Sequence, residues 1–225
     1  SNAVLAVAGD FDPRRLAPKL KTLLAKLPRG ARPQASARFS APAEVGDFTV
    51  RQPREQAVVL QAFPGPCVTA EDFYVGEVAD ELFSGMASRL FERVREEKGL
   101  AYFVRSARIS GVDTGMFSFF AGTQPGREAE VLAEIDAEIA RVQAGEVEPA
   151  ELERCQARLK AGRRQSLQTN GARAMQAGLH VLLGLPVNDG KEQDARIDAV
   201  TIADLARFAT TYFQRARRTQ LIVTP

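Results

Sequence analysis

The stretch Gly85-Met86-Ala87-Ser88-Arg89-Leu90-Phe91-Glu92-Arg93-Val94-Arg95-Glu96-Glu97-Lys98-Gly99-Leu100-Ala101-Tyr102 holds the most informative pattern in the chain. From about Ser88 its apolar residues recur at helical spacing, and Gly99 is typical of a helix end. Two runs of strand-forming residues follow, 102–109 and 116–122, and a glycine-bounded turn over 111–115 separates them. The sequence therefore predicts a helix, a sharp turn and a β-hairpin.

The residues before this stretch predict further strands and one helix. Val4 to Ala8 is a short apolar run that predicts a strand, and Asp12-Pro13 supplies the N-cap and first-turn proline of a helix that runs to about residue 27. Residues 28–46 are rich in proline and glycine and read as a connector. Phe48 to Arg51 and Ala57 to Phe63 read as strands, and an antiparallel pair is the simplest arrangement for them.

Helical periods dominate the rest of the chain. Thr69 and Asp72 resemble a capping box that opens a helix ending near Ser84-Gly85. Further helices are predicted from Arg127, from Glu148-Pro149, over 171–184, and over 201–213 with Thr201 and Asp204 at its start; Leu221 to Val223 is a closing strand. The predicted fold class is α+β, with a mainly antiparallel sheet and helices packed on one face.

The composition excludes several classes of partner. In this 225-residue chain 30 basic residues stand against 28 acidic ones, a formal charge of +2, and the two signs are interleaved. The densest basic cluster, 215–218, holds three arginines and is typical of a solvated helix end, so we expect no nucleic acid partner. No uninterrupted apolar run approaches ~18 residues, so no membrane span is predicted. Ser1-Asn2-Ala3 resembles a remnant of tag removal and is left out of the fold reasoning.

Residues able to bind a metal or act as a nucleophile are scarce. The chain has one histidine, His180, in an apolar helical stretch, so neither H-E-x-x-H nor H-x-x-E-H can be written. No G-x-S-x-G elbow accompanies His180, and the glycines at 111 and 115 join strands instead of opening a phosphate-binding helix. Cys67 and Cys155 have no metal-ligand spacing and are expected to be idle thiols, although one disulfide between them stays open. We therefore expect no metal ligands and no cofactor in this chain.

The quoted stretch, with its Ser-Arg-Leu-Phe start, its charged helix end and its Gly-Leu-Ala-Tyr close, resembles the C-terminal domain of the pitrilysin/insulinase family of zinc metallopeptidases. The resemblance covers nearly all of the chain. It includes Gly9 to Pro13, Asp113 to Gly115, the return strand 116–122, the helix start at 146–160, Arg196 to Thr201 and Leu221 to Val223. Ser84 departs from it, since a glycine is usual there, and so does the arginine-rich ending before Leu221.

The resemblance implies a division of labour between two similarly folded halves that close around an extended peptide. The N-terminal half carries the zinc, and residues 4–225 resemble the C-terminal half, which lacks the metal ligands; residues 4–27 resemble the end of the preceding half. The resemblance also implies that Arg95 and Tyr102, seven positions apart, reach the substrate backbone. The expected partners are thus a zinc-bearing half, in the same polypeptide or in a partner subunit, and a peptide substrate.

Two alternatives stay open at this point. Arg95 and Tyr102 are either the substrate-binding pair or an ordinary helix-surface charge and a strand residue. The chain is either half of a working zinc peptidase or a non-catalytic scaffold or partner subunit of the same fold. The compartment, periplasmic or cytoplasmic in a bacterium, is not predicted by these residues.

Overall fold

The computed structural model describes residues 3–28, 30–31, 45–187 and 190–225. They form two compact units, a larger one within Phe39–Ala161 and Lys191–Pro225 and a smaller one within Ser1–Arg38 and Gly162–Gly190. Most of the predicted connector, 28–46, lies outside the described residues.

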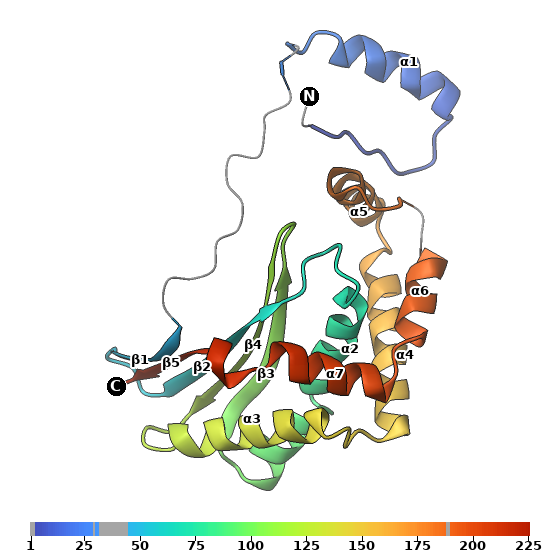
Figure 1. Ribbon diagram of the computed structural model, residues 1–225. Helices are drawn as coiled ribbons and strands as arrows, with labels where there is room; N and C mark the ends of the chain where they lie inside the picture. Colours follow the sequence, from blue (N-terminus) through green and yellow to red (C-terminus); the bar gives the residue numbers. More distant parts are fainter. Residues whose placement is uncertain (1–2, 29, 32–44, 188–189) are drawn as a thin grey trace. The chain divides into compact units, whose positions relative to one another are not determined.

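The larger unit is built on a five-stranded sheet (Figure 1). Its strands are β1 (Gly46–Arg51), β2 (Ala57–Gly65), β3 (Ala101–Ser110), β4 (Gly115–Thr123) and β5 (Thr219–Thr224), in the spatial order β1-β5-β2-β4-β3. The pairs β5–β2, β2–β4 and β4–β3 are antiparallel, and β1–β5 is parallel. The mainly antiparallel sheet is therefore confirmed.

The predicted antiparallel pairing of β1 with β2 is wrong, because β5 lies between them. Two strand spacings are roughly 10 Å, and the five-residue link over 52–56 can span about 16 Å, so the link permits either arrangement. The arginine that precedes β5 favours the observed one. Arg218 is buried and pairs with Asp47 of β1 at 3.0 Å and with Asp136 at 3.5 Å. Arg218 is thus a buried ion-pair partner and not part of a solvated helix end.

Helices cover one face of this sheet. The larger unit contains α2 (Phe73–Phe83), η1 (Phe91–Glu97), α3 (Glu128–Gln143), most of α4 (Pro149–Ser166), α6 (Gly190–Asp198), α7 (Ile202–Tyr212) and the 3₁₀ turn η2 (Arg215–Arg217). Alternate strand residues point toward α2, α3 and α7 and pack with residues of these helices in a core rich in phenylalanine. It contains Phe63, Phe117 and Phe119 from the strands, Phe83 from α2, Phe208 from α7 and Phe213 just after α7. We call the other side, which α2, α3 and α7 leave uncovered, the open face. The predicted α+β class, with helices on one face, is confirmed (Figure 1).

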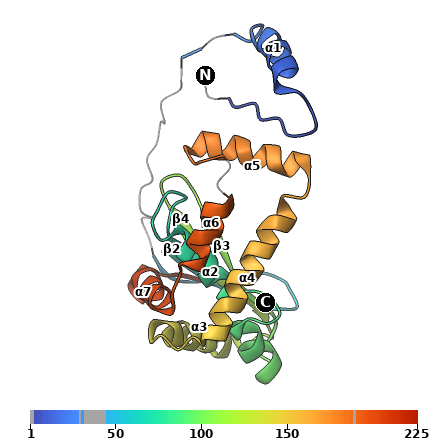
Figure 2. The ribbon, with the colours of Figure 1, turned by 90° about the vertical axis from the view of Figure 1, so that its right-hand side faces the viewer.

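Helix α4 runs beside α2 and α6 (Figure 2). The Gln156 amide donates to the carbonyl oxygens of Ile197 and Val200, each at 3.0 Å, so one side chain of α4 holds the end of α6. Arg158 pairs with Glu81 of α2 at 3.5 Å. The polar sequence of α6 explains why it was not predicted, since only Gln193 and Ile197 of its residues are buried.

The two helix starts predicted from a threonine and an aspartate three residues later have different outcomes. Thr201 accepts a hydrogen bond from the Asp204 N–H at 3.1 Å while Asp204 accepts one from the Thr201 N–H at 3.0 Å, so the two residues form a capping box and the predicted start of α7 is confirmed. The box at Thr69 is wrong: α2 starts at Phe73, and Asp72 makes no capping bond with its side chain. The Asp72 carboxylate instead accepts a hydrogen bond from Arg207 at 2.7 Å. The Asp72 carboxylate, which the spacing predicts as part of a helix cap, is thus bound by an arginine from a distant part of the sequence.

The smaller unit contains α1 (Pro13–Leu24) and α5 (Asn170–Leu183). Asp12 caps α1 by accepting from the Arg14 N–H at 2.8 Å, as predicted. The predicted strand over residues 4–8 is not formed; this segment lies against α5, where a Cβ built on Gly178 would be 3.6 Å from the Ala6 Cβ. A strand needs a neighbouring strand for its backbone hydrogen bonds, and none adjoins this segment in the described residues.

None of the helices formed by the described residues is both long enough and apolar enough to cross a bilayer.

Candidate functional site

The segment that begins at Ser88 forms a short helix whose ends are set by local contacts. The Ser88 hydroxyl accepts a hydrogen bond from the Phe91 N–H at 3.2 Å, which satisfies a donor of the first turn. Leu90 and Val94 are fully buried, and residues 91–97 are wound as a π-helix, η1. Gly99 follows with φ of +57°, a value that a glycine adopts without steric cost. The chain can therefore turn at once from the helix into β3.

A β-bulge at the start of β3 places Tyr102. Ala101 is opposite Thr123 and Phe103 is opposite the preceding residue, Gly122, so Tyr102 is the extra residue of β3. The Phe103 ring lies over Gly122, where an added Cβ would be 2.4 Å from the ring. The bulge breaks the alternation of the strand, and the Tyr102 side chain is 71% exposed.

The structure brings the two predicted site residues together. The guanidinium carbon of Arg95 is 5.6 Å from the centroid of the Tyr102 ring and 4.8 Å from that of Phe91, both within the range of a cation–π contact. The Arg95 side chain is 41% exposed, and its Nε is 3.7 Å from a carboxylate oxygen of Glu96. Two aromatic rings thus orient a guanidinium that still faces solvent beside an exposed phenol.

The neighbouring arginine on η1 is held differently. Arg93 donates to Glu97 at 2.6 Å and to Glu134 of α3 at 3.1 Å. These two hydrogen bonds, the one to Glu97 first, raise the pKa of Arg93 above its usual value. Arg93 is therefore committed to ion pairs within the fold, whereas the donors of Arg95 are accessible to a ligand.

Arg105 is a neighbour that the sequence analysis did not single out. It lies two positions after Phe103 on β3, so the two side chains share the open face. Its guanidinium carbon is 4.5 Å from the centroid of the Phe120 ring, and Phe120 also contacts Phe103, with ring centroids 6.2 Å apart. The sequence does carry one signal for Arg105: it lies two positions after Phe103 on the predicted strand, so the two side chains are expected on the same face of the sheet. Arg105 extends the cationic and aromatic surface of Arg95 and Tyr102 along the open face.

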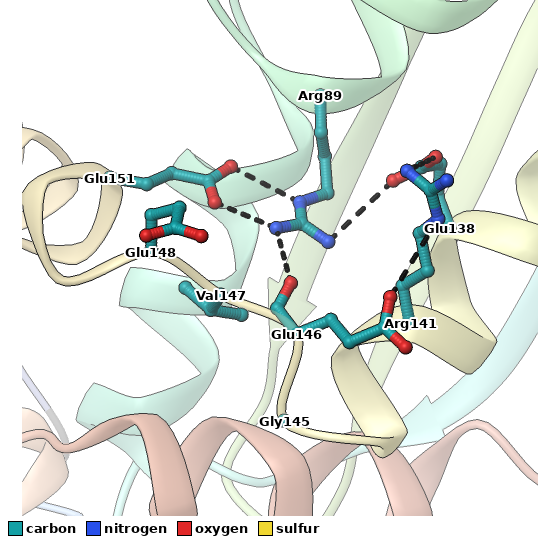
Figure 3. A pocket seen from close by; sticks show the side chains of 8 residues that line it. All are labelled: Arg89, Glu138, Arg141, Gly145, Glu146, Val147, Glu148 and Glu151. Atoms are coloured by element: carbon teal, nitrogen blue, oxygen red, sulfur yellow. Dashed lines mark hydrogen bonds and ion pairs between the residues drawn. The ribbon is translucent and has the colours of Figure 1, made fainter.

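A charged cavity of about 510 Å³ lies around Arg89, at the start of the helix that carries Arg95 (Figure 3). At its centre Arg89 binds Glu151 of α4 with two hydrogen bonds, Nε to Oε1 at 3.1 Å and a second guanidinium nitrogen to Oε2 at 2.7 Å. Arg89 also donates to the Glu146 carbonyl oxygen at 3.0 Å and lies 3.6 Å from Glu138 of α3. Arg89 thus ties the start of the 89–97 helix to two other helices.

The charges of this cavity are matched to one another. The side chains of Arg89 and Glu138 are 11% and 4% exposed, and Arg141 approaches Glu138 at 3.3 Å. Burial raises the pKa of Glu138, and the charges of Arg89 and Arg141 oppose that rise. This arrangement is typical of a buried structural ion-pair network and supports no catalytic acid or base.

The described residues do not fit a zinc ion. Within the described ranges no three histidine, cysteine, aspartate or glutamate side chains are grouped as metal ligands. His180 lies in the smaller unit, where its Nδ1 is 2.5 Å from the Pro186 carbonyl oxygen. Cys67 and Cys155 are both free thiols. The donor set of the described residues therefore gives no zinc site.

Comparison with known proteins places this geometry in a family. Residues 1–159 match the family described as "Peptidase M16 inactive domain". An uncharacterized zinc protease of Streptomyces coelicolor is 30% identical over 219 residues, which cover 93% of this chain and 47% of that protein. A protease from Helicobacter pylori has the same fold, with a TM-score of 0.86 at 21% identity over 97% of this chain and 54% of that one. A peptidase M16 inactive domain from Pseudomonas fluorescens has a TM-score of 0.82 at 18% identity, over 96% of this chain and 52% of that one.

The chain spans half or less of the length of the curated relatives it matches, between 38% and 47% for the Rickettsia bellii, Streptomyces and Bacillus subtilis proteins. Those relatives bear zinc protease names, whereas residues 1–159 of this chain match the family described as the inactive domain. This agrees with the resemblance to the C-terminal, metal-free half drawn from the sequence. The chain belongs to the family of M16 peptidase inactive domains.

Proposed function

We propose that this chain is the metal-free half of a two-part zinc peptidase, in which Arg95 and Tyr102 bind the backbone of an extended peptide beside a zinc site on the other half. The observation that carries the proposal is the exposed guanidinium of Arg95 held 5.6 Å from the exposed ring of Tyr102. Within the described residues no three metal-ligating side chains are grouped, and the proposal accordingly assigns the metal site to the other half, in the same polypeptide or in a partner subunit.

The two side chains offer complementary donors. An arginine presents several N–H groups in a rigid fork, and a tyrosine hydroxyl donates one directional hydrogen bond. Peptide hydrolysis builds negative charge on the carbonyl oxygen, and prepositioned donors stabilise that charge more than they stabilise the ground state. The rings of Phe91 and Tyr102 hold the guanidinium in place before substrate arrives. We therefore assign to Arg95 and Tyr102 the orientation of the scissile backbone and a share in stabilising the transition state.

The test joins this chain to a zinc-bearing half and measures kcat/KM. We expect Arg95→Ala and Tyr102→Phe each to lower kcat/KM by about tenfold to a thousandfold, with zinc content and fold unchanged. Arg93→Ala is the matched control, because Arg93 lies on the same turn but is bound to Glu97 and Glu134. Equal activity of the two site variants and the control would refute the assignment.

The scaffold alternative is favoured by a separate observation. Phe48 and Val50 on β1 are 39% and 41% exposed on the open face, so this apolar side of the sheet is suited to covering by another polypeptide. A scaffold half would need that contact but not the donors of Arg95 and Tyr102. The scaffold alternative predicts that Arg95→Ala and Tyr102→Phe both leave binding to the zinc-bearing half and activity unchanged.

A further inference from the structure

An apolar groove of about 710 Å³ lies at the end of the sheet remote from Tyr102. Pro64 of β2, Ile109 of β3 and Met116 of β4 contribute side chains from the open face, and Tyr212 contributes from the end of α7. Sites for small ligands and ligand ends have volumes of roughly 300–1,000 Å³ and are mostly apolar, with few polar groups. The groove has the size and lining of such a site.

One charged side chain, Arg217, lines this groove, and none of the described residues that line it is acidic. Arg217 belongs to the 3₁₀ turn η2 and is exposed, and it makes no ion pair with another described residue. Its neighbour Arg218 is the opposite case, since Arg218 is buried between Asp47 and Asp136. An apolar groove with one available cation at its edge is complementary to an apolar group that ends in a carboxylate.

We propose that this groove binds the C-terminal end of a peptide, with an apolar last side chain in the groove and the α-carboxylate on Arg217. The open face favours a peptide over a free fatty acid. Tyr102 and Ile109 lie on the same strand and both face outward, and the seven residue steps from one to the other correspond to roughly 23 Å, the length of about seven residues of extended peptide. The link to Tyr102 rests on the proposed function, whereas binding in the groove does not.

Binding is measured by fluorescence polarisation with the chain alone and a fluorescein-labelled heptapeptide that ends in leucine. The peptide is supplied as the free acid and as the C-terminal amide. We expect the acid to bind at least about threefold more tightly, the strength of an exposed ion pair. Arg217→Gln should abolish that difference, and Arg215→Gln, on the same turn but outside the lining, should keep it.

A second pair of variants tests the apolar part. Ile109→Asp places a charge in the groove, and because Ile109 is 62% exposed the fold should tolerate it. It should weaken binding of both peptide forms, while Val112→Asp, at a residue 63% exposed just outside the lining, should not. Arg95→Ala should leave the ratio of acid to amide binding intact, which separates this site from the proposed catalytic pair.

Three outcomes would overturn the proposal. They are equal binding of acid and amide, an acid preference that persists in Arg217→Gln, and no binding of the peptide at all. Decanoate is the probe for the other source of an apolar carboxylate. If decanoate binds with the same dependence on Arg217 while the peptide does not, the groove is a fatty-acid site and the peptide proposal is wrong.

Discussion

Replacing Arg89 by alanine is the perturbation for which the structure gives the clearest magnitude. The change removes two hydrogen bonds to Glu151 and one to the Glu146 carbonyl oxygen, and it takes away the cation 3.6 Å from Glu138. Breaking a buried ion pair by deleting one partner costs about 3–5 kcal/mol, because the other charge stays buried. Arg141 still pairs with Glu138, so we expect a loss of about 2–4 kcal/mol in the free energy of unfolding.

Urea denaturation measures this loss. With a slope of about 2 kcal/mol per molar, the unfolding midpoint should fall by roughly 1–2 M. Arg141→Ala is the control, since that side chain is 53% exposed and its ion pairs should contribute less than about 1 kcal/mol. Glu138→Gln in the Arg89→Ala background should recover part of the stability, because it removes the charge left in the cavity. A loss below about 1 kcal/mol for Arg89→Ala would refute the reasoning.

The cost of Arg89→Ala should also depend on pH. Burial raises the folded-state pKa of Glu138 above its unfolded value, so the folded state binds more protons and stability falls as pH rises through that interval. The charge of Arg89 opposes this rise, so its removal should raise the folded-state pKa of Glu138 further and widen the pH interval over which stability is lost. The difference in stability between wild type and Arg89→Ala should therefore be larger at pH 7 than near pH 4.5. A difference that shrinks toward neutral pH would contradict this account.

Three further predictions concern thiols, glycines and zinc. A hydrogen bond from a neighbouring threonine lowers the pKa of Cys67, and burial raises the pKa of Cys155 to about 11. At pH 8 a disulfide reagent should therefore modify Cys67 quickly and Cys155 only on unfolding. Cys67→Ser should remove the fast phase of the reaction. Gly115→Ala should cost about 2–3 kcal/mol in thermal unfolding because its Cβ would meet a backbone carbonyl oxygen at 2.2 Å. Gly162→Ala should stabilise α4 by up to about 1 kcal/mol, because its Cβ would meet no atom within 4 Å beyond its chain neighbours and the backbone of its own helix. Metal analysis of the dialysed chain should find far less than one zinc per chain, and stoichiometric zinc would contradict the expected absence of ligands.

Elements with strong local signals are those that the sequence predicts best. The hairpin of β3 and β4, the helix α3 and the start of α7 at Thr201 and Asp204 all follow from patterns within 23 residues or fewer, the length of the hairpin over 101–123. The position of β1 is not local information. It depends on β5, about 170 residues later, and on the buried contact between Arg218 and Asp47. Pairing each strand with the next one in the sequence therefore gave β1–β2, because the partner strand β5 lies at the other end of the chain.

The candidate site could be predicted in part. The family resemblance implies the pair Arg95 and Tyr102, and the turn at Gly99 brings the two side chains near one another. The π-helical winding of η1 and the bulge at Tyr102 were not predicted. Both involve long-range packing: Leu90 and Val94 are fully buried, and the Phe103 ring lies over Gly122 of the neighbouring strand. Such three-dimensional constraints leave no short-range pattern.

The distribution of backbone irregularities bears on the choice between a functional pair and ordinary surface residues. A π-helix, a glycine at positive φ and a β-bulge occur together between Phe91 and Phe103. Each departs from regular hydrogen bonding, and π-helices and bulges are frequent at functional sites. Selection for stability alone would favour a regular helix and an unbroken alternation, which would change the relation between Arg95 and Tyr102. The irregularities have one shared consequence, an exposed guanidinium beside an exposed phenol, and this supports the proposal that the pair acts on a substrate.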